Sequence, residues 1–193
     1  MMPTQKLDSM INANKPSRQN TRGFTLVEML VTVLLLSLLM SMAVPSFREA
    51  TLSSQLTSFA NDFVASTVLS RSEAIKRNSQ VTLCATTCAT SATTCTCATS
   101  GGWEQGWVVL ADIDLDGSID DVVSRHAALK TGLKMTDASN TRSMTFEPSG
   151  VGSTQVTMTL CRNSPSAGTN ERVITVSATG RASVSKTTTG SCP

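Results

Sequence analysis

Residues 22–47 read RGFTLVEMLVTVLLLSLLMSMAVPSF, and this stretch determines how the rest of the chain is interpreted. Between residues 24 and 44 the only charged side chain is that of Glu28. A helix over residues 24–44 would be about 31 Å long at ~1.5 Å per residue, which is enough to cross the hydrocarbon core of a bilayer. An ionised carboxylate in hydrocarbon is costly and needs a partner, so Glu28 requires an explanation.

A basic segment precedes the apolar run. Residues 1–23 hold a single acid, Asp8, against the basic residues Lys6, Lys15, Arg18 and Arg22. This order is typical of a targeting segment that enters a membrane with its positive end inside. The whole chain has a formal net charge of +2, but the part after residue 23 has a formal net charge of −1. Charge therefore gives no support to nucleic-acid binding by that part.

The apolar run has three interpretations. A secretory signal fits the small residues at 41–43 before Val44, and a permanent anchor fits the length of the run, but neither explains Glu28. The stretch as a whole resembles the N-terminus of type IV pilin-like proteins, the pilins and pseudopilins. The resemblance implies that a prepilin peptidase cuts between Gly23 and Phe24 and then methylates Phe24. The family's glutamate, five residues into the mature chain, corresponds to Glu28.

Cleavage would create a cationic amine on Phe24, and this amine gives Glu28 a partner. In a filament of parallel helices, the amine of one subunit approaches Glu28 of its neighbour, and each charge relieves the desolvation of the other. An unpaired charge would penalise a wrong axial offset, so the pair sets the register between subunits. The leader, residues 1–23, is longer than most leaders of the family, and translation from Met10 would shorten it.

A second helical segment is predicted beyond Pro45. Proline inside a helix removes a hydrogen bond, but in the resembled family the helix continues past a proline at this depth. Apolar residues then recur at helical spacing: Leu52, Leu56, Phe59, Ala60, Phe63, Val64, Val68 and Ile75. Mostly off that face lie the charged residues Arg48, Glu49, Asp62, Arg71, Glu73, Lys76 and Arg77. One apolar stripe needs a partner surface, so we expect this half to pack on a globular head and to end at Asn78.

From Val81 the spacing of the apolar residues changes to two. Short β-rich runs follow at residues 81–85, 106–112, 120–126, 132–136, 143–147, 153–162, 172–178 and 181–185. Glycine-containing turns such as Asp116-Gly117 and Thr179-Gly180 separate them, which favours antiparallel sheet and an α+β fold. The predicted organisation is a leader (1–23), a transmembrane and assembly helix (24–47), the amphipathic half of that helix (48–78) and a β-rich head (79–193).

The head resembles one branch of the pilin-like proteins, the GspH/FimT pseudopilins and minor pilins. The stretches that carry this resemblance are GWVVLADIDLDG (106–117), TFEPSGVGS (145–153), VTMTLCR (156–162) and RVITVSATGRA (172–182). Together with the N-terminal motif, the resemblance covers most of residues 22–182. It implies an antiparallel two-sheet head packed on the helix, and a minor subunit at the tip of a filament.

Six cysteines follow the apolar run, at Cys84, Cys88, Cys95, Cys97, Cys161 and Cys192. Zinc is the alternative for the first four, but they lack paired C-x-x-C spacing and the chain's one histidine, His126, is distant in sequence. An even number of cysteines in an exported region favours disulfides. Nested pairs, Cys84–Cys97 and Cys88–Cys95, would staple a hairpin, with other pairings open, and Cys161–Cys192 would tie the polar tail to a strand.

Residues 112–121, DIDLDGSIDD, resemble the opening of an EF-hand calcium loop. The matching positions are Asp112, Asp114, Asp116, Gly117 and Ile119. The twelfth position, where a bidentate glutamate belongs, is Val123, and no flanking pair of helices is predicted. The Asp-Gly pair also fits a hairpin turn. We therefore assign no metal site and keep calcium binding as an alternative.

DNA is the other partner considered. Some minor pilins of the FimT type bind DNA through a basic G-R-x-R motif near the C-terminus. The matching stretch here begins at Gly180-Arg181 and lacks the second arginine, for which Lys186 could partly substitute. A near-neutral mature domain predicts weak, salt-sensitive binding to phosphates, and Arg181 also fits a solvated strand residue.

Nothing in the sequence favours catalysis. There is no nucleophile motif or phosphate-binding loop, and His126 has no obvious triad partner, so no enzymatic activity and no cofactor are predicted. The predicted protein is a minor pilin or pseudopilin of the bacterial inner membrane, with its head in the periplasm, which primes or caps a type IV pilus or a type II secretion pseudopilus. Its partners would be the prepilin peptidase, other pilin-like subunits and the membrane. The alternative is a FimT-like role in DNA uptake for natural transformation.

Overall fold

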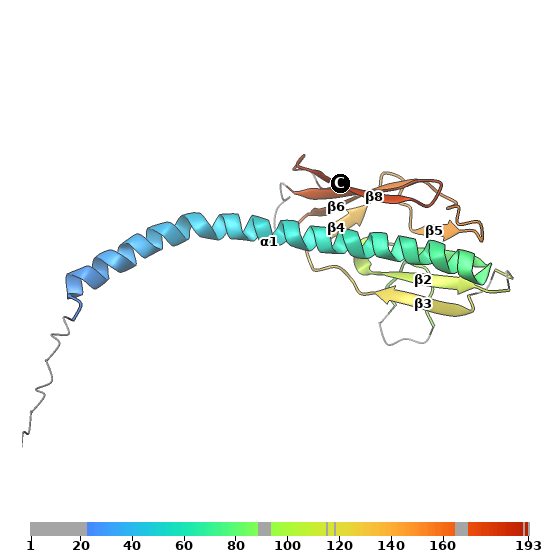
Figure 1. Ribbon diagram of the computed structural model, residues 1–193, viewed down its shortest axis with the longest axis horizontal. Helices are drawn as coiled ribbons and strands as arrows, with labels where there is room; N and C mark the ends of the chain where they lie inside the picture. The colour runs from blue at the N-terminus through green and yellow to red at the C-terminus, as the bar shows by residue number, and fades with distance from the viewer. Residues whose placement is uncertain are drawn as a thin grey trace, which may run out of the picture. The chain divides into compact units, whose positions relative to one another are not determined.

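The fold is described here from a computed structural model, which covers residues 23–88, 94–114, 116–117, 119–164, 170–190 and 192. The chain divides into two compact units, Met1–Met42 and Ala43–Pro193. Helix α1 (Leu26–Arg77) contributes to both units, and the strands follow it in the second (Figure 1). The predicted leader, apart from Gly23, lies outside the described residues.

Helix α1 (Leu26–Arg77) covers nearly all of the predicted helical segment, residues 24–78, and starts two residues later. It continues through Pro45 and ends at Arg77. Asn78 follows with a φ of 51°, the left-handed conformation that asparagine tolerates better than most residues and that commonly ends a helix. The prediction that Asn78 stops the helix is therefore confirmed.

The buried face of α1 differs in part from the predicted stripe. Val68 and Ile75 were predicted to face the core, and this is wrong, because they are 55% and 52% exposed. The buried positions in this region are Thr67, Ser70, Glu73 and Ala74. Thr67 and Ser70 can be buried because their hydroxyls donate to carbonyls one turn earlier in the helix, at 3.0 and 2.8 Å. A spacing rule that counts apolar residues alone misses such positions.

Glu73 also departs from the predicted pattern, since we expected the charged residues mostly off the buried face. It is only 9% exposed. Its carboxylate accepts a hydrogen bond from Arg77 Nε at 2.7 Å, and Arg77 in turn reaches Asp121 at 2.8 Å. The bond from Arg77 lowers the pKa of Glu73 below its ordinary value of 4.5, against the opposing effect of burial. This paired network ties the end of α1 to the first sheet.

Two antiparallel four-stranded sheets make up most of the second unit. The first has the order β3-β2-β1-β5, from β3 (Asp121–His126), β2 (Trp107–Asp112), β1 (Gln80–Ala85) and β5 (Ser143–Phe146). The second has the order β4-β6-β7-β8, from β4 (Leu133–Thr136), β6 (Val156–Arg162), β7 (Glu171–Val176) and β8 (Ala182–Thr187). Each strand overlaps one of the predicted β-rich runs, and the α+β fold with a two-sheet head is confirmed.

An aromatic cluster joins α1 to the first sheet. Phe63 packs edge to face on Trp103, in the short helix η1 (Trp103–Gln105), and on Trp107, with ring centroids 5.1 and 5.3 Å apart. Both indole N–H groups donate, Trp103 to the carbonyl of Thr141 at 2.7 Å and Trp107 to Ser66 Oγ at 2.9 Å. Because all three rings are at most 1% exposed and both donors are satisfied, the cluster forms the centre of the core.

Two turns of the head also press against α1. Gly150 and Gly180 have φ values of +77° and +74°. A Cβ on Gly150 would lie 2.8 Å from Ile75 Cδ1, and one on Gly180 would lie 3.3 Å from Arg71 Cδ. Both turns therefore favour glycine, for the left-handed backbone and, most clearly at Gly150, for the close approach to the helix.

Candidate assembly site

The first part of α1 exposes its apolar side chains in every direction. All residues from Gly23 to Arg48 are exposed, including Leu26, Leu30 and Leu34 at 76%, 62% and 66%. An 18-residue window of the helix has a mean hydropathy of 2.3, and none of that window is buried. By length and composition, this helix is able to cross a membrane.

Glu28 lies in the first turn of this helix. The hydroxyl of Thr25, which precedes the helix, accepts a hydrogen bond from the backbone N–H of Glu28 at 3.2 Å, and the carbonyl of Thr25 accepts one from Met29 at 3.2 Å. Thr25 followed three residues later by Glu28 is the spacing of a capping box. A carboxylate here also faces the positive end of the helix dipole, so the position has a local stabilising role as well as any role between subunits.

Gly23 and Phe24 come directly before that cap. Phe24 is 76% exposed. A Cβ built on Gly23 would meet no atom within 4 Å, and Gly23 is not among the glycines with a positive φ. The fold of this chain therefore gives no steric reason for a glycine at position 23.

Three disulfides cross-link the head, and they are the pairs that we favoured from the sequence. Cys84 bonds to Cys97 and Cys88 to Cys95, with Cα atoms 5.5 and 5.6 Å apart. Cys161, on β6, bonds to Cys192 with a Cα separation of 5.5 Å. All six cysteines are used, so none is left as a thiolate ligand for zinc.

The aspartates of the predicted calcium loop lie between β2 and β3. The carboxylates of Asp112, Asp114 and Asp116 come within 4.8 Å of one another. Backbone N–H groups of the same loop donate to two of them: Gly117 to Asp112 at 3.0 Å and Asp116 to Asp114 at 3.2 Å. Strands, not helices, flank the loop, and Val123 lies within β3. The EF-hand geometry and its twelfth ligand are therefore missing here.

The two candidate DNA contacts are not brought together. Arg181 follows the Gly180 turn and is exposed, and Lys186 lies near the far end of β8. Five residues of strand separate them by about 16 Å, and an odd separation directs their side chains to opposite faces. Lys186 therefore does not stand where a second arginine of a G-R-x-R motif would stand.

The comparisons with known proteins agree with this fold. The family described as "Type II transport protein GspH" matches residues 60–180. The chain belongs to this family. A second family, described as "Prokaryotic N-terminal methylation motif", matches residues 18–44. No curated protein matches the chain. A GspH-family head behind an N-terminal methylation motif makes this protein a minor pilin or pseudopilin, a type of structural subunit.

Two solved structures share the fold of the GspH-family chain. Both are of the type IV minor pilin FimU of Pseudomonas aeruginosa, in different crystal forms. One is 21% identical, covers 68% of this chain and 89% of its own chain, and has a TM-score of 0.53. The other is 22% identical, covers 67% of this chain and 92% of its own, and has a TM-score of 0.51. At this level of identity they support the pilin-like fold.

The head of this GspH-family protein also contains a buried carboxylate that the sequence analysis missed. Glu171 opens β7 and is 0% exposed. Its Oε2 accepts from Thr187 Oγ1 at 2.7 Å, from Thr189 Oγ1 at 2.7 Å and from the Thr189 N–H at 3.0 Å. Its Oε1 accepts from the Gly190 N–H at 2.6 Å. Burial acts to raise the pKa of Glu171, but these four bonds outweigh it and lower the pKa below the ordinary 4.5.

Arg172, the next residue, holds the second sheet to α1. It is 6% exposed, and its guanidinium donates to the hydroxyls of Ser53 and Thr57 and to the carbonyl of Ser53, at 2.8 to 3.2 Å. It also donates to the carbonyl of Glu171 at 3.0 Å. The signal in the sequence was an adjacent acid and base at the start of a β-rich run. Alternation directs the two side chains to opposite faces of the sheet, and both are buried, Glu171 against residues 187–190 and Arg172 against α1.

His126 has a packing role in the structure. Its ring stacks on Trp107 with centroids 3.8 Å apart and an angle of 5° between the planes. Its Nε2 lies 3.5 Å from a carboxylate oxygen of Asp62 on α1. The histidine thus joins the end of β3 to the helix.

Proposed function

We propose that this protein is made as a precursor, cut by a prepilin peptidase between Gly23 and Phe24, and methylated on the new amino group of Phe24. Two features support this processing. Folding gives no steric reason for a glycine at position 23, whereas recognition by a peptidase would. Phe24 is 76% exposed and precedes the helix, so the bond before it is accessible to an enzyme.

The apolar part of α1 would then hold the subunit in the bacterial inner membrane by a single crossing, with the head in the periplasm. The observation that carries this proposal is the run of apolar side chains that is exposed on every side of the helix. A helix on the surface of a soluble domain hides its apolar stripe, but a helix that is apolar all round needs lipid or other helices around it. Three disulfides in the head fit an oxidising compartment.

Glu28 would act in assembly. In lipid its carboxylate lacks water, and the amine of Phe24 on a neighbouring subunit would be a suitable partner for it. Because burying two charges offsets much of their attraction, the pair would contribute mainly to the choice of axial register and little to net affinity.

The assembled protein would be a minor subunit that primes or caps a filament. The family description refers to type II transport, and the solved structures with the same fold are type IV minor pilins. Both machines build filaments from subunits with this N-terminal helix, so a subunit at the tip of a type IV pilus or of a type II secretion pseudopilus fits the fold equally well.

Mass spectrometry of the mature protein from its native membrane tests the processing. We expect an N-terminal N-methylated Phe24. A mature chain that starts at Val44 would instead identify a conventional secretory signal, and a chain that retains residues 1–23 would contradict the proposal.

The substitution Glu28→Ala tests assembly, and Thr25→Ala is its matched control. Glu28→Ala removes the charge, and we expect cleavage and methylation to persist while incorporation into filaments falls. Thr25→Ala removes a capping bond to the same turn, at a cost of about 1 kcal/mol, but keeps the charge. Normal incorporation of Glu28→Ala, or an equal loss in Thr25→Ala, would show that the charge does not set the register.

A further inference from the structure

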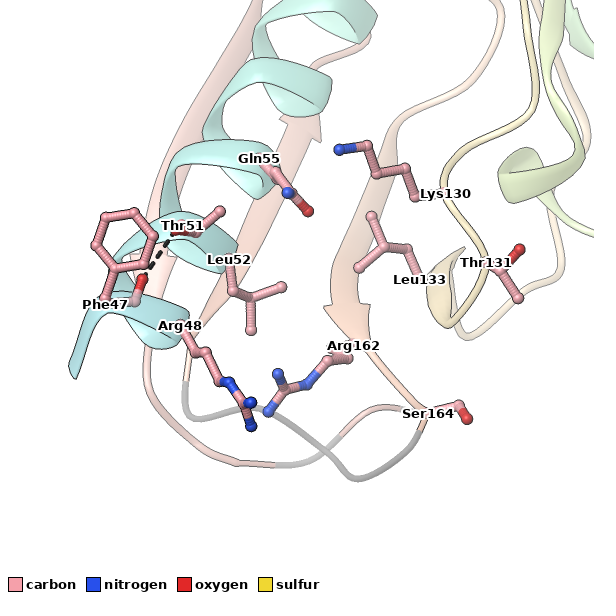
Figure 2. A pocket seen from close by; sticks show the side chains of 10 residues that line it. All are labelled: Phe47, Arg48, Thr51, Leu52, Gln55, Lys130, Thr131, Leu133, Arg162 and Ser164. Atoms are coloured by element: carbon pink, nitrogen blue, oxygen red, sulfur yellow. Dashed lines mark hydrogen bonds between the residues drawn. The ribbon is translucent and has the colours of Figure 1, made fainter. Parts of the chain in front are cut away.

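A basic pocket lies between α1 and the second sheet, within the unit Ala43–Pro193. It has a volume of about 500 Å³. Five residues of α1 line one side, and five residues of the head line the other; they are Phe47, Arg48, Thr51, Leu52 and Gln55, and Lys130, Thr131, Leu133, Arg162 and Ser164. Leu52 and Leu133, which are 6% and 7% exposed, face each other at its floor (Figure 2). The pocket thus has an apolar base under a polar rim.

Three cations surround the opening. Figure 2 shows the guanidinium groups of Arg48 and Arg162 pointing toward each other, with the ammonium group of Lys130 directed across the pocket toward α1. One acid offsets them, since Arg162 pairs with Glu49 at 3.2 Å. Within the part of the chain that the structure describes, the side chains of Arg48 and Lys130 make no hydrogen bond or ion pair. Two guanidinium groups that face each other repel, so an anion between them would be stabilised.

The position of the pocket along the helix indicates the source of that anion. The apolar run ends at Val44, and Arg48 comes about 6 Å further along the helix axis. The headgroup layer on each side of a bilayer core is about 5–7 Å thick. Phe47, on the lip of the pocket, is 75% exposed and would lie near the glycerol ends of the acyl chains. Arg48 therefore lies at the depth of lipid phosphates when residues 24–44 span the membrane.

We propose that this pocket binds the phosphate group of an anionic phospholipid while the subunit is in the membrane. The proposal rests on the membrane placement given under Proposed function. Arg48 presents a planar donor pair that matches phosphate oxygens, and Arg162, which also pairs with Glu49, and Lys130 add positive charge.

Native mass spectrometry of the full chain in a neutral detergent tests the lipid preference. Phosphatidylglycerol and phosphatidylcholine with identical acyl chains are titrated separately. We expect phosphatidylglycerol to bind at least about tenfold more tightly, because each cation near an anionic headgroup strengthens binding about fivefold. Absence of a preference in the wild-type chain would overturn the proposal, as would complete displacement of the lipid by millimolar inorganic phosphate.

Matched single substitutions show whether the pocket is responsible. Arg48→Gln and Lys130→Gln each remove one positive charge from the rim, and both side chains belong to exposed residues, so folding is retained. We expect each to weaken phosphatidylglycerol binding about fivefold and the double variant about 25-fold. Lys76→Gln removes the same charge at the other end of α1, where the side chain is 74% exposed, and should change nothing. Equal losses in all three single variants would mean general attraction to the lipid and would overturn the proposal.

Two further measurements separate this inference from the proposed function. Membrane fractionation of the wild-type chain comes first. If the chain is absent from the membrane fraction, the proposed function itself is contradicted. If the chain is in the membrane but shows no preference for phosphatidylglycerol, only the pocket proposal is contradicted. If incorporation into filaments is also lost in Arg48→Gln, the pocket accepts an acidic group of a neighbouring subunit, and the lipid assignment is overturned.

Discussion

Replacing Glu171 with glutamine removes one negative charge from the least accessible carboxylate of the head. The carboxylate accepts four hydrogen bonds from residues 187–190, three on Oε2 and one on Oε1. Glutamine keeps the shape but has one acceptor atom, so at least one of the four donors then faces an NH₂ group. A hydrogen bond to a charged group contributes about 1.5–3 kcal/mol and a neutral one about 0.5–1.5 kcal/mol.

The net loss follows from these contributions. Three retained bonds each weaken by about 1 kcal/mol, and the donor without an acceptor costs about 1–3 kcal/mol. Glutamine carries no charge, so the variant avoids the desolvation cost of a buried carboxylate, and this offsets part of the loss. We therefore expect the free energy of unfolding to fall by about 3 kcal/mol. Glu147→Gln is the control: this exposed glutamate accepts one side-chain bond, from Gln80 at 3.0 Å, and should change stability by less than about 0.5 kcal/mol.

Urea unfolding of the full chain in detergent, followed by circular dichroism with the disulfides intact, measures this difference. Hydrogen exchange of the amides of Thr189 and Gly190, which donate to Glu171, detects local release of the tail. Faster exchange at these two amides and a lower urea midpoint are expected in Glu171→Gln only. Equal urea midpoints for Glu171→Gln and Glu147→Gln, with unchanged amide exchange at Thr189 and Gly190, would show that the four hydrogen bonds do not hold residues 187–190 in place.

Three further outcomes are expected. Because the pKa of Glu171 is lowered in the folded chain, its contribution to stability is present above the ordinary value of 4.5 and is lost as the pH falls through the lower folded value. The difference in unfolding free energy between wild type and Glu171→Gln should therefore shrink as the pH falls below 4.5, and a constant difference would contradict this. Arg172→Lys should cost about 2–4 kcal/mol in urea unfolding, because an ammonium cannot reach the hydroxyls that the guanidinium binds; a neutral result would show that a point charge suffices there. Gly150→Ala should lower the melting temperature more than Gly117→Ala does: both have a positive φ, but only the first would bring a Cβ against α1. Equal shifts would mean that backbone strain alone decides.

The elements of this fold could be predicted because each has a local cause. The apolar run, the stripe from Leu52 to Phe63 and the alternation after Val81 depend on side chains of neighbouring positions, and the structure has a helix and strands there. The end of α1 at Asn78 is also local, since it depends on one residue that tolerates a left-handed backbone.

The buried polar residues could not be predicted in this way. Thr67 and Ser70 are buried because the helix itself offers their hydroxyls a carbonyl, which a count of apolar residues cannot register. Glu171 and Arg172 depend on partners 16 to 119 positions away in the chain, so only the packed sheets bring their donors and acceptors together. The rim of the basic pocket has the same origin, since Arg48 and Arg162 meet only when β6 packs beside α1.

The aromatic cluster gives this protein a built-in optical probe. The chain has two tryptophans and no tyrosine, and both indoles contact Phe63 of α1. Nearly all of its intrinsic fluorescence therefore originates at the interface between α1 and the first sheet, called here the seam. A red shift of that emission reports water entering the seam, so separation of the helix from the head can be followed on unlabelled protein, in a membrane or during filament growth.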